Sequence, residues 1–104
     1  MPTYNPYPAL TQALRAVGAQ PVVDWGLSDY IVTVALPDGR EIVISPPQEP
    51  SEPHPPRAWT VDLHDRRADS AEVVYDSTDS GPDAEHAGRL DPLLRAVRSH
   101  LPSN

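Results

Sequence analysis

The sequence predicts an α+β fold in which an N-terminal and a C-terminal helix cover one face of a five-stranded antiparallel sheet. Apolar residues recur at helical spacing near both ends of the chain, and five segments between them are rich in β-branched or alternating apolar residues. Turn-forming residues separate most neighbouring segments, which is typical of strands that pair in chain order. We therefore expect the order helix, three strands, proline-rich loop, two strands, helix, in one domain spanning residues 1–104.

The first helix is predicted over residues 8–17. Pro8 suits the first helical turn, because its missing N–H would have no partner there, and Gly18 favours an end to the helix. A helix this short is not stable alone in water, so we expect it to pack on the sheet. Its apolar stripe consists of Leu10, Ala13, Leu14 and Val17.

Three strands are predicted next, over residues 22–25, 30–36 and 40–44. The Pro-Asp-Gly sequence at 37–39 favours a tight turn, so the second and third strands form a hairpin. Residues 30–36 are apolar on both faces, which indicates a strand near the centre of the sheet.

Residues 46–57 contain six prolines, a density that neither a helix nor a strand ladder tolerates, so this segment is predicted to be a loop. The fourth strand is predicted over 59–64, where apolar and polar residues alternate, and the fifth over 71–75. The following segment, 76–88, is polar and acidic, and we expect it to be an irregular loop.

The last helix is predicted to begin with Asp91 as its N-cap and Pro92 at its first position, and to end at Pro102. Arginines in its later turns complement the helix dipole. Its apolar face consists of Leu93, Leu94, Val97 and Leu101.

The composition indicates a thin core. Leu, Ile and Val supply 22 of the 104 residues and Phe is absent. A thin core favours self-association, because a homodimer buries apolar area that a small chain cannot bury alone. The chain has no cysteine, which excludes disulfides, thiolate catalysis and cysteine-ligated metals.

The charge balance is acidic, with 15 Asp and Glu against eight Arg, for a net charge of −7. Such a chain repels a phosphate backbone, and its few arginines do not cluster, so direct nucleic-acid binding is not expected. The N-terminal sequence does not resemble a signal peptide, and no apolar run approaches the roughly 20 residues that cross a bilayer. We therefore expect a cytoplasmic protein without membrane contact.

Pro47, Pro50, Pro53 and Pro56 recur every third residue, which is the period of a polyproline II helix. Such a rod is either a stiff loop between two strands or a motif read by an aromatic groove of a partner protein. We therefore retain these four prolines as candidate interaction residues.

Asp62 and His64 are predicted to project from the same face of one strand. A carboxylate and an imidazole so placed can ligate a metal or act as a base with its orienting partner. A third ligand would have to come from His54, His86 or His100, and no spacing places any of these nearby. The simpler interpretation is that the pair belongs to the solvated face of the strand.

Trp25, Tyr30, Trp59 and Tyr75 all fall on predicted strands. Because Phe is absent, we expect these rings to fill the core. If two or more of them faced outward together, they would form a patch for a partner or ligand, so Trp25 and Trp59 are retained as further candidate interaction residues.

The sequence favours a non-catalytic protein that engages another protein or a second copy of itself. It has no Gly-x-Ser-x-Gly elbow, P-loop or GxGxxG motif, so no catalytic residue or cofactor is predicted. Two alternatives remain open. One is a metal- or small-molecule-binding protein that uses Asp62 and His64, and the other is an acidic inhibitor or nucleic-acid mimic.

Overall fold

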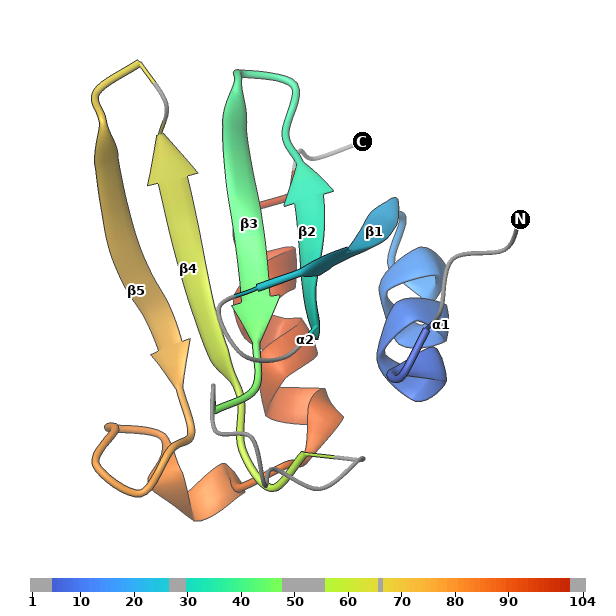
Figure 1. Ribbon diagram of the computed structural model, residues 1–104, viewed down its shortest axis with the longest axis vertical. Coiled ribbons are helices and arrows are strands. Elements are labelled where there is room, and N and C mark those ends of the chain that lie inside the picture. The colour runs from blue at the N-terminus through green and yellow to red at the C-terminus, as the bar shows by residue number, and fades with distance from the viewer. Residues whose placement is uncertain (1–4, 27–29, 48–55, 66, 102–104) are drawn as a thin grey trace.

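A computed structural model describes the chain except for residues 1–4, 27–29, 48–55, 66 and 102–104. It has an N-terminal helix, a five-stranded antiparallel sheet and a C-terminal helix, which confirms the predicted elements (Figure 1). In chain order these are α1 (Pro8–Ala16), β1 (Pro21–Trp25), β2 (Tyr30–Ala35), β3 (Arg40–Ser45), β4 (Thr60–Asp65), β5 (Ser70–Asp76), a 3₁₀ helix (Ala84–His86) and α2 (Leu90–Arg98).

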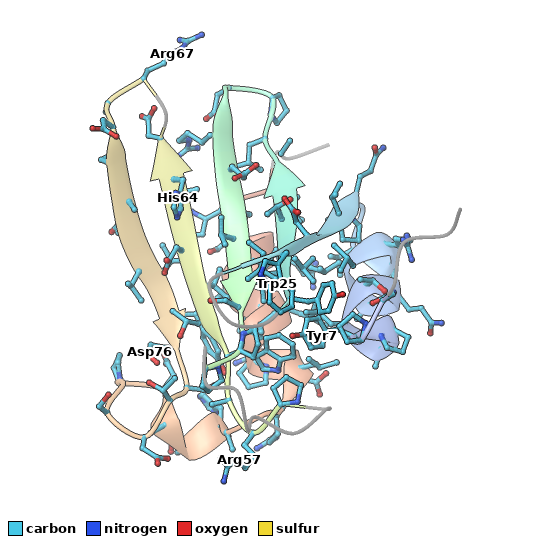
Figure 2. All side chains as sticks on the ribbon, in the orientation of Figure 1. Tyr7, Trp25, Arg57, His64, Arg67 and Asp76 are labelled. Atoms are coloured by element: carbon cyan, nitrogen blue, oxygen red, sulfur yellow. The ribbon has the colours of Figure 1, made fainter. Side chains whose placement is uncertain are left out.

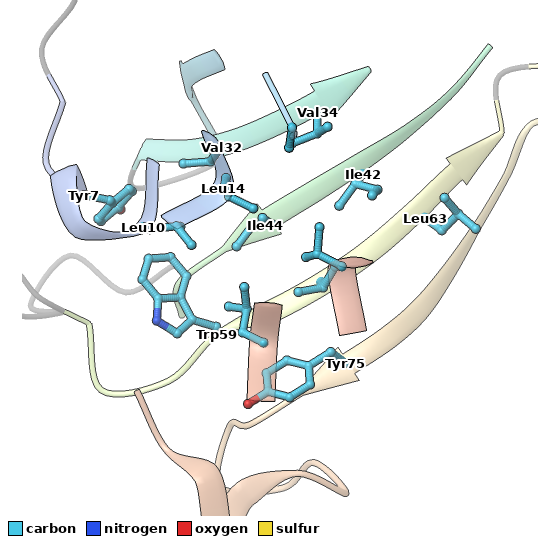
Figure 3. Close-up of a cluster of buried hydrophobic side chains, with 14 of the residues drawn as sticks. Tyr7, Leu10, Leu14, Val32, Val34, Ile42, Ile44, Trp59, Leu63 and Tyr75 are labelled. Carbon is cyan, nitrogen blue, oxygen red and sulfur yellow. The ribbon is translucent and has the colours of Figure 1, made fainter. Parts of the chain in front are cut away.

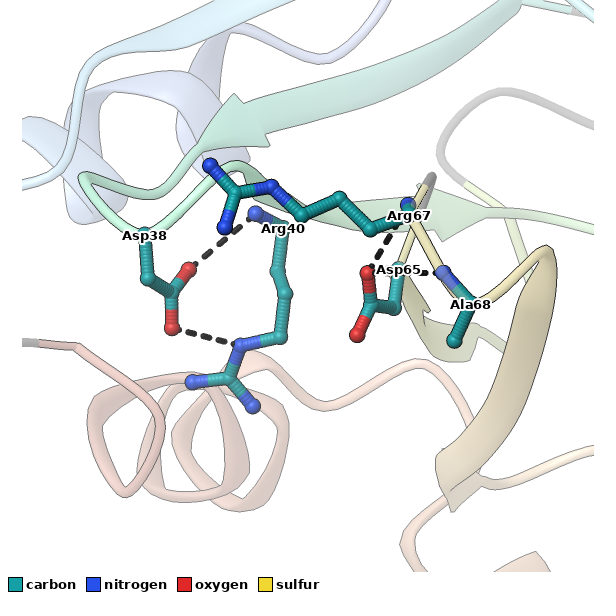
Figure 4. A network of polar contacts seen from close by, with 5 residues as sticks. All are labelled: Asp38, Arg40, Asp65, Arg67 and Ala68. Atoms are coloured by element: carbon teal, nitrogen blue, oxygen red, sulfur yellow. Dashed lines mark hydrogen bonds and ion pairs between the residues drawn. The ribbon is translucent and has the colours of Figure 1, made fainter.

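The sheet is a meander in which each strand pairs antiparallel with the next, in the spatial order β1-β2-β3-β4-β5. Gly39 adopts a φ of 90° in the predicted β2–β3 turn. There Asp38 accepts hydrogen bonds from the backbone N–H of Arg40 at 3.1 Å and from its Nε at 2.7 Å (Figure 4). The backbone hydrogen bond lowers the pKa of Asp38.

The β4–β5 turn is closed by a carboxylate in a similar way. Asp65 Oδ1 accepts hydrogen bonds from the backbone N–H groups of Arg67 and Ala68, at 3.0 and 3.3 Å (Figure 4). Each turn therefore contains an aspartate that accepts hydrogen bonds from the backbone, as the preference of this residue for turn positions predicts.

One face of the sheet forms the core together with both helices (Figure 3). Along β2, β3 and β4 the side chains alternate, so that every second one enters this cluster, and the helices contact each other as well as the sheet. The strands contribute Val32, Val34, Ile42, Ile44, Val61, Leu63 and Tyr75, and the helices contribute Leu10, Leu14, Leu93 and Val97.

The start of α2 differs from the prediction. Arg89, not Asp91, occupies the N-cap position, and it makes no side-chain capping bond. Asp91 and Pro92 lie within the first turn, where an acidic residue and a proline are both tolerated. The helix begins earlier than predicted because Leu90 packs against the core. It ends at Arg98, before the predicted end at Pro102, which lies outside the described residues.

The acidic segment 76–88 is more ordered than predicted, because it contains the 3₁₀ helix and closes on itself. The backbone N–H of Asp83 donates to the carbonyl oxygen of Asp76 at 2.8 Å, and Asp83 Oδ2 accepts from the Asp76 N–H at 3.1 Å. Gly81 is required here, since a Cβ at this position would lie 2.3 Å from Asp76 Cγ.

In the proline-rich segment, residues 46–47 and 56–59 belong to no helix or strand, while Pro50 and Pro53 lie outside the described residues. Within the part of the chain that the structure describes, no helix has the length and apolarity needed to span a membrane.

We expect Leu14→Ala to lower the free energy of unfolding by about 2–5 kcal/mol, because it leaves a cavity where α1 packs on the sheet. Leu14 is fully buried. Urea unfolding followed by circular dichroism measures the change, with Gln12→Ala on the exposed side of the same helix as the control. Equal stability of the two variants would show that α1 does not pack on the sheet as described.

Candidate functional site

The two tryptophans have opposite environments. Trp59 is 2% exposed and belongs to the core, as predicted, whereas Trp25 is 58% exposed, which contradicts the prediction that it fills the core. The difference follows from sheet position. Trp59 precedes the interior strand β4, whereas Trp25 ends β1, an edge strand that pairs only with β2.

A row of four aromatic rings connects these tryptophans, and we call Trp25, Tyr30, Tyr7 and Trp59 the aromatic row. Trp25 and Tyr30 meet edge to face with ring centroids 4.9 Å apart, as do Tyr7 and Trp59 at 5.1 Å. The Tyr7 hydroxyl donates to the carbonyl oxygen of Tyr30 at 2.7 Å, which joins the two pairs. Figure 2 shows Trp25 and Tyr7 well apart from Arg67, which lies in the β4–β5 turn.

The buried end of the aromatic row lines an apolar groove of about 430 Å³. Pro6 and Tyr7 come from the segment before α1, Pro56 and Trp59 from the segment before β4, and Leu90 from the start of α2. The groove thus lies where three separate segments meet. Among the candidate interaction residues, the structure brings Pro56 and Trp59 together here, while Pro47 is half-buried and does not line this groove.

Sequence reasoning did not single out Tyr7. Its position between two prolines, immediately before a helix, was the available signal, because such a segment has few accessible conformations. The Asn5 side chain accepts a hydrogen bond from the Tyr7 N–H at 2.9 Å and donates to Thr11 Oγ1 at 3.0 Å. These bonds orient the segment so that the Tyr7 ring reaches Trp59.

Ser77 holds Trp59 in place from the other side. The backbone N–H of Trp59 donates to Ser77 Oγ at 2.9 Å, and the Ser77 N–H donates to the Trp59 carbonyl oxygen at 2.9 Å. The Ser77 hydroxyl also lies 2.7 Å from the Ala87 carbonyl oxygen, to which it donates. One buried hydroxyl therefore links β4 to the segment that precedes α2.

Asp62 and His64 do project from one face of β4, as predicted. His64 Nε2 lies 3.9 Å from Asp62 Oδ2, which is too long for a hydrogen bond. Asp62 Oδ1 is buried without a hydrogen-bond partner in the described structure. Burial raises the pKa of Asp62, and the charge of Asp76 acts in the same direction while His64 opposes it.

Among the described residues, no third metal ligand lies beside this pair. No group of three or more His, Cys, Asp or Glu suited to a metal occurs among the described residues. His86 stacks on Tyr75 with ring centroids 6.4 Å apart, His100 follows α2, and His54 lies outside the described residues.

Comparison with known proteins finds no matching family model, no similar curated protein and no similar solved structure.

We expect Ser77→Ala to lower the free energy of unfolding by about 1–3 kcal/mol, because it leaves the Trp59 N–H and the Ala87 carbonyl without their buried partner. Thermal or urea unfolding measures the loss. Ser80→Ala, at an exposed position in the same segment, serves as the control and should change stability by less than about 0.5 kcal/mol. If both variants behaved alike, the Ser77 hydroxyl would not link the two segments.

We expect Asp62→Asn to increase the free energy of unfolding at pH 7. Because the pKa of Asp62 is raised, the folded state binds the carboxyl proton more tightly than the unfolded state does. The stability of the wild type therefore falls as the pH rises from 3.8, the ordinary pKa of an aspartate, through the pKa that Asp62 has in the folded state. The gain should therefore vanish below pH 3.8, where the carboxyl is protonated in both states. Asp38→Asn, which removes a carboxylate with a lowered pKa, should have the opposite sign. An NMR titration of Asp62 at or below 3.8 would contradict this account.

Proposed function

We propose that this protein is a non-catalytic binding module that contacts another protein through the exposed end of its aromatic row. The observation that carries the proposal is Trp25, a large apolar side chain that remains 58% exposed in the folded chain. Trp and Tyr are enriched at protein interfaces, where they account for a large share of the binding energy. Covering the exposed part of Trp25 would contribute on the order of 3 kcal/mol.

The surroundings of Trp25 support a role as an anchor. Its ring rests against Tyr30, whose carbonyl oxygen accepts the Tyr7 hydroxyl bond, and its backbone N–H donates to the Asp24 carboxylate at 2.8 Å. An anchor that is already oriented loses less conformational entropy on binding than a freely rotating side chain.

The groove supplies a second apolar contact at the far end of the row. Its walls come from prolines and aromatic rings, which change shape little on binding. A partner that covers Trp25 and inserts an apolar side chain into the groove would make two contacts joined by the rigid Tyr7–Tyr30 link. The partner is either a second copy of the chain or a different protein.

The proposal predicts that benzoylphenylalanine, an aromatic photo-crosslinking residue that keeps a large apolar ring at position 25, forms one discrete adduct when placed there in the full chain in the native host cell. The same residue at position 67, which is exposed in the β4–β5 turn at the other end of the sheet, should form none. The adduct mass distinguishes a second copy from another protein. The absence of an adduct at position 25, or identical adducts at both positions, would overturn the proposal.

A second crosslinking position tests whether Trp25 anchors the partner or only lies near it. With the crosslinker at position 9, an exposed position that lines the groove, we expect an adduct that Trp25→Ser abolishes and Gln12→Ser leaves intact. Because Trp25 is exposed, Trp25→Ser should change the unfolding free energy by less than about 1 kcal/mol. Persistence of the adduct in Trp25→Ser would show that Trp25 does not anchor the partner.

A further inference from the structure

The face of the sheet opposite the core carries a continuous row of side chains across all five strands. Val22, Thr33, Val43, Asp62 and Val73 are successive cross-strand partners from β1 to β5. We call the surface around this row the open face. Both described helices add their buried side chains to the core on the opposite face, and Val22 and Val73 are 60% and 58% exposed.

The open face is acidic as well as apolar. Asp24, Glu41 and Asp76 occupy the same side of their strands as Asp62, as their strand pairings show. His64 is the only basic residue among the described strand positions of this face. Its neighbours therefore supply Asp62 with little positive charge.

Asp62 itself is incompletely compensated within the described structure. One carboxylate oxygen is buried without a hydrogen bond, and the other faces an imidazole nitrogen 3.9 Å away. The raised pKa of Asp62 agrees with this geometry, since burial and the nearby Asp76 charge both disfavour its ionised form. The exposed part of the Asp62 carboxylate can accept a guanidinium from a partner, and a guanidinium retains its charge when partly buried.

We propose that the open face binds a segment of another protein that presents arginine among apolar side chains, with Asp62 accepting the guanidinium. The valines provide the apolar contacts on either side of Asp62. Hollows of about 550 Å³ beside Thr33 and Glu41 and about 270 Å³ beside His64 flank the row and can receive further side chains.

The carboxylates and the extent of the open face disfavour other classes of ligand. Carboxylates repel nucleic acid and anionic lipid. A second copy laid face to face would place one set of carboxylates against another without an arginine between them. A small cation would leave most of the row uncovered, because five strands spaced about 4.8 Å apart span about 19 Å.

The probe for this proposal is a synthetic octapeptide of alternating arginine and valine, titrated into the full chain. We expect NMR shift changes centred on the row, a fall in the pKa of Asp62 on peptide binding, and weaker binding of a lysine–valine peptide. Asp62→Asn should weaken binding of the arginine peptide about tenfold or more, since it removes a charge-assisted pair. Unchanged affinity in Asp62→Asn would overturn the proposal.

Two control variants make the result specific. Asp38→Asn removes an exposed carboxylate that already binds Arg40, and should leave affinity within about twofold. Trp25→Ser should also leave it unchanged, so this proposal fails or stands independently of the aromatic row. Equal losses in Asp38→Asn and Asp62→Asn would show non-specific attraction to net negative charge and would overturn the assignment of Asp62.

Discussion

The fold depends on one face of the sheet, on which two short helices pack together. Each helix has nine residues, too few to be stable alone in water, so both form because their apolar stripes pack on the same strands. Leu10 and Leu14 from one helix and Leu93 and Val97 from the other meet in one cluster. With so few core formers in the chain, the core has little apolar material left for a second layer.

Two side chains outside the core are only partly covered by the rest of the described chain. The edge strand β1 ends in an exposed indole, and the interior strand β4 carries a half-buried carboxylate on the side away from the helices. Trp25 keeps much of its apolar surface in water, and the Asp62 carboxylate remains partly exposed. A partner can therefore contact both groups without displacing the core.

The local rules of strand and turn formation were sufficient for most of the fold. The Pro-Asp-Gly turn, the alternation in 59–64 and the apolar stripes of both helices lead directly to the observed elements.

Trp25 was predicted incorrectly because alternation shows which side of a strand a residue occupies, but not whether another element covers it. The start of α2 was also misplaced, since the packing of Leu90 outweighs the capping preference of Asp91. The aromatic row joins segments far apart in sequence, which no local pattern reveals.

Part of the acidic charge lies on one face of the sheet, which composition alone does not show. Described arginines lie on helices, in turns and connections, or at position 40 on the core side of β3, whereas four carboxylates lie near valines on the open face: Asp24, Glu41, Asp62 and Asp76. A phosphate backbone presents charge without interruption, at about 1.7 Å per charge along the duplex, and offers no apolar side chains in the row. The mixed row therefore complements a protein segment that carries both arginine and apolar residues better than it imitates nucleic acid. Solubility requires no such arrangement, because carboxylates scattered over loops would serve it equally well.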